Sequence, residues 1–232
     1  MITAGGKTGH AMQVLRDALE AHRGKIALAC SFGGPAGMVL LDMVAELDRS
    51  VPVYYLDTGL LFAETYALAQ RVSARYGIKP LAVRPELTVE EQNGRYGEAL
   101  WVRDPDACCQ LRKVEPQRAF LAAFDAWITG LRRDQANTRS AVPFAAHDER
   151  SGGLAKIAPL ADWTDADVWA YVVRHDVPYN PLNDRGYPSL GCTHCTRAVG
   201  PGEDARAGRW AGRGKVECGL HFGPSDESSR PA

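Results

Sequence analysis

The chain has 232 residues, more than the ~100–150 residues typical of one domain, so one α/β-sized domain with appendages is expected. Hydrophobic residues make up 45% and charged residues 24%, a composition that excludes a disordered or fibrous chain. Lys and Arg total 27 against 28 Asp and Glu, and the resulting net charge of −1 supplies no general field for holding a nucleic acid.

The first predicted strand covers residues 25–30, a short apolar run. A glycine-rich turn at 31–34 follows it directly, and residues 38–44 then repeat apolar side chains with a helical period. This order predicts a strand, a tight loop and a helix.

The same order recurs in the next segment of the chain. A strand is expected at 53–56, a turn at 57–59, and a helix from about Phe62 to Tyr76. Gly77 stands where the residue after a helix often adopts a left-handed conformation, so the helix should end there.

Three further strands are expected, at 80–83, 126–130 and 155–160. After the last of them, Thr164 stands three residues before Asp167, the spacing of a helix N-cap, and this helix should continue to about His175. Alternating strands and helices predict a doubly wound, mostly parallel sheet with helices on both faces. Ligands bind such sheets at the carboxyl ends of the strands.

The last fifty residues differ in kind, since they are glycine-rich and show almost no apolar periodicity after Asn183. We therefore predict two parts, a nucleotide-binding α/β domain at 1–182 and a flexible C-terminal tail or lid at 183–232. The loops at 31–37, 57–61 and 130–139 should share one rim of the sheet beneath that tail.

The turn at 31–34 joins a strand to a helix, so its backbone N–H groups and the helix N-terminus can hold an anion. Neither G-x-x-x-x-G-K-[ST] nor G-x-G-x-x-G is present there. A glycine-rich turn without a ligand is the alternative. A second basic loop at 130–139 follows another strand and contains three arginines, which favours phosphate or sulfate binding over an ordinary solvated loop.

Six cysteines are too few for a disulfide scaffold, and clustered cysteines in a reducing compartment bind metal or perform redox chemistry. Cys192 and Cys195 form a C-x-x-C pair, which fits structural zinc, a redox dithiol or half of a cluster site. The adjacent Cys108 and Cys109 diverge by about 100° on a helix, which suits separate iron atoms of a cluster better than one tetrahedral zinc. Spacing therefore favours an iron–sulfur cluster.

Two other features bear on the chemistry. Lys113 follows Cys109 by one helical turn, where a cation would tune a cluster and reach a bound anion, although an ordinary surface lysine is the alternative. Cys218 lies in the tail, with Lys215 and His221 three residues away on either side to stabilise its thiolate and Glu217 acting against it. An unremarkable exposed thiol is the alternative for Cys218, whereas Cys30 ends a strand and is expected in the core.

Together these segments resemble the assimilatory adenylyl-sulfate reductases, relatives of the 3′-phosphoadenylyl-sulfate reductases within the adenine nucleotide α-hydrolase fold. The resemblance covers roughly Lys25 to Phe222. Its carriers are Ser31–Gly33, Tyr55–Gly59, Cys108–Pro116, Thr129–Gln135, Cys192–Arg197 and Glu217–His221.

The resemblance implies a [4Fe–4S] cluster on Cys108, Cys109, Cys192 and Cys195 and a nucleophilic thiolate at Cys218. It also implies substrate contacts from Ser31, Phe32, Gly33, Gly34, Asp57, Lys113, Arg132 or Arg133, Arg206, Arg209 and His221. The sequence departs from the family pattern twice. Residues 35–37 lack the acidic residue often found there, and the aromatic run that commonly follows Gly-Arg-Trp is reduced to Trp210.

The implied reaction converts adenosine 5′-phosphosulfate to sulfite and AMP through an S-sulfocysteine on Cys218, which thioredoxin or a glutaredoxin-like dithiol resolves. No second cysteine accompanies Cys218 locally, so an external dithiol is needed. The alternatives are a 3′-phosphoadenylyl-sulfate reductase, an ATP-dependent sulfurtransferase of the same fold and a nucleotide-binding redox sensor.

The start of the chain has no apolar signal-peptide core and no run approaches the ~18 apolar residues of a membrane span, so a cytoplasmic protein without a membrane or nucleic-acid partner is expected. The sequence leaves open whether the chain forms a homo-oligomer.

Overall fold

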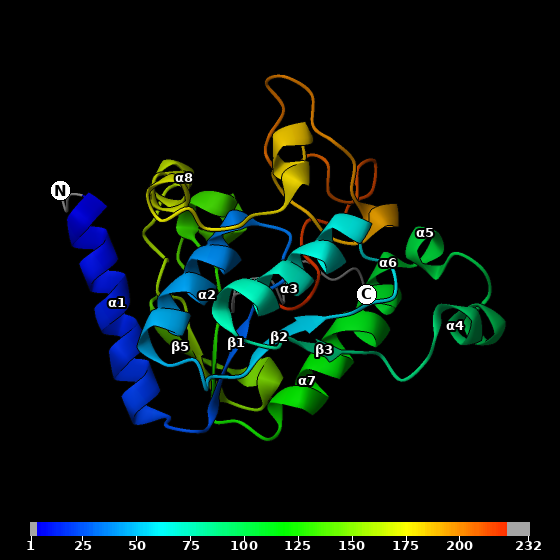
Figure 1. The fold of residues 1–232 in the computed structure, drawn as a ribbon. Helices are drawn as coiled ribbons and strands as arrows, with labels where there is room; N and C mark the ends of the chain where they lie inside the picture. The colour runs from blue at the N-terminus through cyan, green and yellow to red at the C-terminus, as the bar shows by residue number, and fades with distance from the viewer. Residues whose placement is uncertain (1–3, 222–232) are drawn as a thin grey trace.

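The computed structural model describes residues 4–221 and contains a six-stranded sheet in the order β3-β2-β1-β4-β6-β5 (Figure 1). Neighbouring strands are parallel except β5, which runs antiparallel to β6 at one edge. The mostly parallel sheet predicted from the sequence is therefore confirmed. The strands are β1 (Ile26–Ala29), β2 (Val53–Leu56), β3 (Leu81–Val83), β4 (Ala126–Ile128), β5 (Ala145–Asp148) and β6 (Leu154–Ile157).

The helices lie between and around these strands, and a π-helix (Gln110–Val114) continues α6 into α7. Three helices match the predicted ones: α2 follows β1, α3 follows β2 and α8 follows β6. The helices α1, α4, α5 and α7 and the strand β5 were not predicted. The α-helices are α1 (Ala4–Ala21), α2 (Pro35–Leu47), α3 (Ala63–Tyr76), α4 (Val89–Tyr96), α5 (Leu100–Arg103), α6 (Pro105–Cys109), α7 (Glu115–Leu121) and α8 (Asp165–Arg174).

Side-chain alternation along the strands builds a core on each face of the sheet. In β1, Ile26 and Leu28 pack in the larger core with side chains of α1, α2, α3 and α8, whereas Ala27 faces the smaller core. That smaller core holds Trp127 of β4 and Leu121 of α7, both fully buried. Because successive strand residues point to opposite faces, the short apolar strands cover both cores, and the predicted helices on both faces are confirmed.

The two helix ends predicted from sequence signals are confirmed. Gly77 caps α3 with φ of 69°, the left-handed conformation that glycine adopts at little cost. Thr164 caps α8 in a capping box, since its side chain accepts from the Asp167 N–H while the Asp167 carboxylate accepts from the Thr164 N–H. Local capping chemistry thus fixes where these helices begin and end.

Residues 183–221 contain only short 3₁₀ helices and isolated bridges among irregular backbone. Figure 1 shows this segment, yellow to red, gathered over α3 and next to α6, and a bridge between Leu61 and Cys192 joins it to the loop after β2. Buried Trp210 and Glu217, each 2% exposed, show that it packs closely on the sheet domain. The division at residues 182 and 183 and the mobility of the tail stay predictions, and Phe222, the last residue of the resemblance, lies outside the described part.

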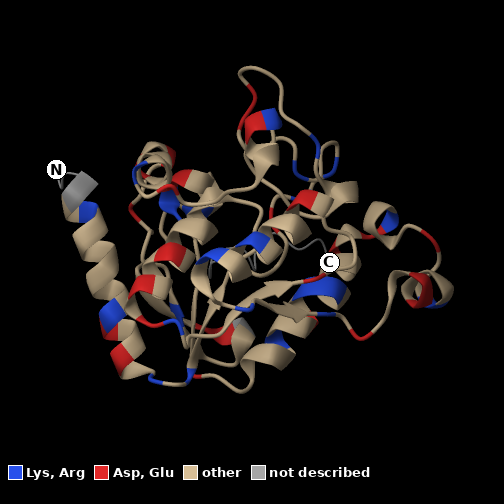
Figure 2. Ribbon diagram, in the orientation of Figure 1, with Lys and Arg blue, Asp and Glu red and all other residues tan. Residues whose placement is uncertain are grey.

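Figure 2 shows basic and acidic residues interspersed along the ribbon, with neither kind confined to one part of the fold. Within residues 4–221 no helix is long and apolar enough to cross a membrane.

One ion pair attaches α1 to α8. The Lys7 ammonium donates to the Asp167 carboxylate at 2.7 Å and to the Asp162 carbonyl at 3.0 Å. Burial opposes the charge on Asp167, but hydrogen bonds from Lys7 and from the backbone and side chain of Thr164 bring the pKa of this carboxyl from 3.8 down to about 2. Asp167 therefore stabilises the folded state only while it is ionised.

Replacing Asp167 by Ala should lower the free energy of unfolding by about 1–2 kcal/mol, because α8 loses its cap and α1 loses its anchor. A lowered pKa means that this stabilisation is complete above the unfolded value near 4 and is lost as the pH falls towards 2. Thermal unfolding of wild type and variant should thus differ by a constant amount from pH 7 to about 4 and converge below. Asp17→Asn, at an exposed hydrogen bond to Gln13, is the control, and an equal effect from it would contradict this account.

Candidate active site

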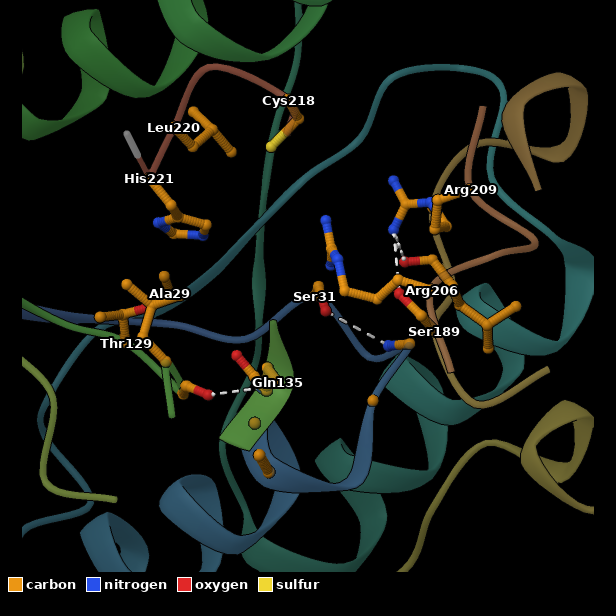
Figure 3. A pocket seen from close by; sticks show the side chains of 18 of the residues that line it. Ala29, Ser31, Thr129, Gln135, Ser189, Arg206, Arg209, Cys218, Leu220 and His221 are labelled. Atoms are coloured by element: carbon orange, nitrogen blue, oxygen red, sulfur yellow. Dashed lines mark hydrogen bonds between the residues drawn. The ribbon is translucent and has the colours of Figure 1, made fainter. Parts of the chain in front are cut away.

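A cavity of about 430 Å³ opens at the carboxyl ends of the central strands. Its walls come from the turn after β1, from β2, from the loop after β4 and from three stretches of the C-terminal segment. The topology places a ligand site at this edge of the sheet, as the sequence predicted. Figure 3 shows His221 and Thr129 on one side of the cavity and Arg206 and Arg209 on the other, with Cys218 and Ser31 between them.

The turn after β1 presents its backbone to the cavity. Gly34 is the extended N-cap of α2 and Pro35 begins the helix, so the free N–H groups of the first turn point towards the cavity. A Cβ on Gly33 would lie 2.9 Å from Leu190 Cβ, so glycine is needed for the close approach of the tail. Ser31, Gly33 and Gly34 all line the cavity, as predicted for substrate contacts.

Phe32 lies elsewhere. Its backbone has a positive φ of 53°, its ring is fully buried against Tyr55, and its carbonyl accepts from the Asn180 side chain at 3.0 Å. It is not among the lining residues. Phe32 therefore shapes the turn from the core side, and the substrate contact that the resemblance implies for it stays a prediction.

The loop after β4 separates its arginines. Arg132 lines the cavity and is paired with Asp165 at 3.0 Å and with Asp134 at 3.6 Å. Arg133 points away, donating to the Val142 carbonyl at 2.8 Å and lying over the Phe144 ring. The resemblance left Arg132 and Arg133 open, and the geometry brings only Arg132 to the cavity.

Asp57 lies outside the cavity as well. Its carboxylate accepts from the Tyr66 hydroxyl at 2.7 Å, from Arg84 Nε at 3.0 Å and from the Gly59 N–H at 3.2 Å. Burial opposes the charge on Asp57, but these hydrogen bonds hold the pKa of its carboxyl below its usual value. Asp57 thus organises the turn after β2 and does not line the cavity, and the substrate contact that the resemblance implies for it stays a prediction.

Four thiols meet beside this cavity. Cys108 and Cys109 end α6, and Cys192 and Cys195 lie in the C-terminal segment, each 7–9% exposed. All four line a second, small cavity with Trp101 and Lys113, and each is a free thiol. Cys192 Sγ lies 3.3 Å from Thr58 Oγ1. The predicted convergence of the two cysteine pairs is present in the structure.

The four sulfurs are the donor set expected of a cluster site. Burial raises the pKa of Cys108 to about 12 and that of Cys109 to about 11, so without metal these groups are neutral thiols and metal binding must release their protons. Across residues 4–221 no group of three or more His, Cys, Asp or Glu side chains is placed as it stands to hold a metal ion. The case for a cluster rests on four free, buried thiols that share one cavity.

Lys113 connects the two cavities. It lies in the π-helix after Cys109, lines both cavities and is 9% exposed. Burial opposes its charge, but Cys192, Cys218 and Cys109, once they are thiolates, outweigh burial and raise the pKa of Lys113 above its usual value. A permanent positive charge therefore stands in the wall between the four cysteines and the larger cavity, as predicted.

The remaining predicted residues are contributed by the tail. Cys218 lines the large cavity and in Figure 3 directs its sulfur into it. Arg209 donates to the Leu190 carbonyl at 2.9 Å, and His221 stacks on Trp127 with ring centroids 5.9 Å apart. Burial and nearby Lys156 lower the pKa of His221 well below 6.5, so its imidazole is neutral. Arg206, Arg209 and His221 all line the cavity, as predicted.

Two residues of this site were missed by the sequence analysis. Arg139 and Glu217 both line the cavity and form a buried ion pair at 2.7 Å. Arg139 belongs to the arginine-rich loop, and Glu217 precedes the predicted nucleophile, so both stood within segments already singled out. Their pairing joins positions 78 residues apart, which no local pattern reveals.

Comparison with known proteins agrees with this geometry. Residues 25–198 match the phosphoadenosine phosphosulfate reductase domain. Two similar proteins are both called adenosine 5′-phosphosulfate reductase: that of Shouchella clausii is 47% identical over 93% of this chain and 89% of its own length, and that of Halalkalibacterium halodurans is 48% identical over 90% of each.

A similar solved structure is the phosphoadenylyl-sulfate reductase of Candida auris in a phosphate complex, 34% identical with a TM-score of 0.70. The match covers 82% of this chain and 90% of that one. Domain match, relatives and fold agree with the cysteine and arginine geometry, and the chain belongs to the phosphoadenosine phosphosulfate reductase family.

Proposed function

We propose that this chain reduces adenosine 5′-phosphosulfate to sulfite and AMP, with Cys218 as nucleophile and a thioredoxin-type dithiol as electron donor. One observation carries the proposal: Lys113 forms the wall between a cavity that holds the Cys218 thiol and a cavity lined by four cysteines. The substrate is proposed because the chain is 47–48% identical to proteins called adenosine 5′-phosphosulfate reductase.

The cations of the cavity suit an anionic sulfonate. Five positively charged side chains line it, and three of them, Arg132, Arg139 and Arg206, already pair with carboxylates. In the described part of the chain Lys113 and Arg209 have no carboxylate partner. These two cations are therefore the ones free to neutralise the sulfonate and phosphate oxygens when a thiolate approaches.

The chemistry then proceeds in three displacements. The Cys218 thiolate attacks the sulfonate sulfur, the bond from sulfur to the phosphate oxygen breaks with its electron pair leaving on AMP, and an S-sulfocysteine forms. A thiolate of the donor next attacks Cys218 Sγ, which releases sulfite and forms a mixed disulfide. The second donor thiol displaces Cys218 as a thiolate, so the donor supplies the two electrons and leaves oxidised. Thiol nucleophile and dithiol donor both suit the reducing cytoplasm.

Cys108, Cys109, Cys192 and Cys195 would hold a [4Fe–4S] cluster, since four buried free thiols sharing one cavity match the ligands of such clusters. When bound, the cluster would supply local negative charge and keep Lys113 oriented, and it need not exchange electrons. Lys113 would then hold its ammonium between the thiolates and the substrate anion.

Protein purified without oxygen should be brown and contain about four iron atoms per chain. Iron and acid-labile sulfide analysis, with the visible absorption spectrum, measures this directly. Cys192→Ser should lose iron and colour, whereas Cys30→Ala, at a buried thiol 1% exposed in the core, should keep both. A colourless protein with one zinc would contradict the cluster and leave Cys218 as the proposed nucleophile.

The test of the function is a sulfite assay with adenosine 5′-phosphosulfate and reduced thioredoxin as the sole reductant. Sulfite and AMP should appear in equal amounts. Nucleotide binding without sulfite release would indicate the redox sensor instead, and ATP cleavage would indicate the sulfurtransferase.

A further inference from the structure

The residue before Cys218 is held more tightly than a surface tail requires. Glu217 is 2% exposed, and its two oxygens accept from Arg139 Nε and Nη2, each at 2.7 Å. Arg206 Nη2 donates to the same carboxylate at 3.1 Å and to the Val216 carbonyl at 2.7 Å. The chain just ahead of the nucleophile is thus fixed by two guanidinium groups, one of them bidentate.

A second set of hydrogen bonds connects this carboxylate to the sheet. Arg139 Nη1 donates to Gln135 Oε1 at 2.6 Å, and Gln135 Nε2 donates to the Gly130 carbonyl at 3.1 Å, two residues beyond the end of β4. Gln135 Oε1 also accepts from the Arg132 N–H at 3.2 Å. Glu217 is thereby tied to a rigid strand end, which fixes the position of the adjacent Cys218.

The charge balance supports a positioning role. Burial would raise the pKa of the Glu217 carboxyl, but hydrogen bonding and charge from Arg139 and the charge of Arg206 lower it below its usual value, so Glu217 is ionised at neutral pH. A buried carboxylate is tolerated only when it is paired in this way. Arg139 and Arg206 are correspondingly occupied by Glu217.

The C-terminal segment contains a second bidentate ion pair, Arg197–Glu203, which can serve as a control for the Arg139–Glu217 pair. Arg197 binds the two Glu203 oxygens at 2.7 and 2.8 Å, but both side chains are more than a third exposed. Exposed ion pairs of this kind contribute little to the stability of the folded state. Neither Arg197 nor Glu203 lines the cavity, so this pair is matched in chemistry to the Arg139–Glu217 pair and differs in position.

We propose that Glu217, clamped by Arg139 and Arg206, is the positioning residue that holds Cys218 Sγ in the cavity. Arg139 and Arg206 thus hold the nucleophile-bearing segment through Glu217, while Lys113 and Arg209 line the cavity without a carboxylate partner among the described residues. This role rests on the proposed function, because it concerns the geometry of the attack on sulfur. Glu217 touches no reacting atom and acts only through Cys218.

The test compares Glu217→Gln with Glu203→Gln in the cluster-loaded protein. Gln keeps the shape of the side chain and removes the charge that holds both arginines. Glu217→Gln should lower kcat about 10- to 100-fold, since a displacement near 1 Å can cost about 100-fold, while the KM for the nucleotide stays within about threefold. Glu203→Gln should leave both constants unchanged.

A second measurement needs no substrate. Iodoacetamide labelling of the peptide that contains Cys218, followed by mass spectrometry, should be about fivefold faster or more in Glu217→Gln, because the released segment exposes the thiol. Arg139→Lys keeps the charge but loses the two-point contact, so it should move kcat and labelling in the same direction. This variant also decides the matter if Glu217→Gln fails to fold.

Unchanged labelling and an unchanged kcat in both variants would overturn the proposal. So would a raised KM with an unchanged kcat, because that result assigns Glu217 and Arg139 to substrate binding. If wild type releases no sulfite, the proposed function fails on its own, and labelling of Cys218 still shows whether Glu217 holds this segment.

Discussion

Replacing Cys218 by Ser is expected to lower sulfite release at least about 1,000-fold while leaving the iron content and nucleotide binding intact. Cys218 lines the large cavity and is not among the residues around the second cavity, where four of the other five thiols lie. The serine hydroxyl stays protonated, since no carboxylate or histidine is hydrogen-bonded to position 218 among the described residues to act as its base. A thiolate therefore cannot be replaced by a hydroxyl here.

The intermediate provides the direct measurement. Wild type mixed with substrate but no reductant should gain one SO₃ group on the peptide that contains Glu217 and Cys218, and should lose it when thioredoxin is added. The serine variant should gain none. Cys30 is a buried thiol that also lines the large cavity, so Cys30→Ala is the control for the other thiol of this cavity and should keep the adduct. An adduct on Cys192 or Cys195 would assign the chemistry to the C-x-x-C pair instead.

Those parts of the fold that follow from local signals were predictable. The strands β1, β2 and β4 are short apolar runs buried on both faces. Helix α3 ends at a glycine, and helix α8 begins at a capping threonine. Each signal lies within a few residues of the feature that it determines. The prediction that the loops share one rim then followed from the parallel order of the strands.

Several elements were not predicted, and for α1 and β5 the physical reason is clear. Helix α1 buries few large side chains, with Ala11 and Ala18 beside Leu15, and its first turn contains two glycines, which weaken the helical pattern. Strand β5 (Ala145–Asp148) has three exposed residues of four, and its apolar content is low. Its place at the sheet edge depends on pairing with β6, which the sequence of β5 alone does not specify.

The site divides in the same way. Residues whose role depends on the type of loop, such as Ser31, Gly33 and Arg209, line the cavity as predicted. Phe32 and Asp57 stand in the right loops, but their side chains turn into the core or bind the turn after β2, because orientation depends on backbone φ and distant partners. The Arg139–Glu217 pair could not be predicted from the sequence for the same reason, since only the fold brings the two charges together.

The largest expected difference between substrates concerns the 3′-phosphate. We expect kcat/KM for adenosine 5′-phosphosulfate to exceed that for the 3′-phosphorylated nucleotide by about 100-fold or more. A 3′-phosphate adds about two negative charges, and within the described residues only Lys113 and Arg209 of the cavity cations are unpaired with a carboxylate. Asp134 and Asp165, which line the same cavity, would repel the added charge.

The 3′-phosphorylated nucleotide is the main alternative for the substrate, because a phosphoadenylyl-sulfate reductase is 34% identical to this chain and residues 35–37 lack an acidic residue. Initial rates of sulfite release with each nucleotide, at limiting concentration and with the same thioredoxin, give the two kcat/KM values. Asp165→Asn frees Arg132 from one of its two carboxylates, so it should narrow the difference by raising the rate with the 3′-phosphate form. Asp176→Asn, at an exposed pair with Arg75 outside the cavity, is the control and should change neither value. Preference for the 3′-phosphate in wild type would mean that one of the carboxylate-bound arginines releases its partner to bind the nucleotide, and the substrate assignment would then be reversed.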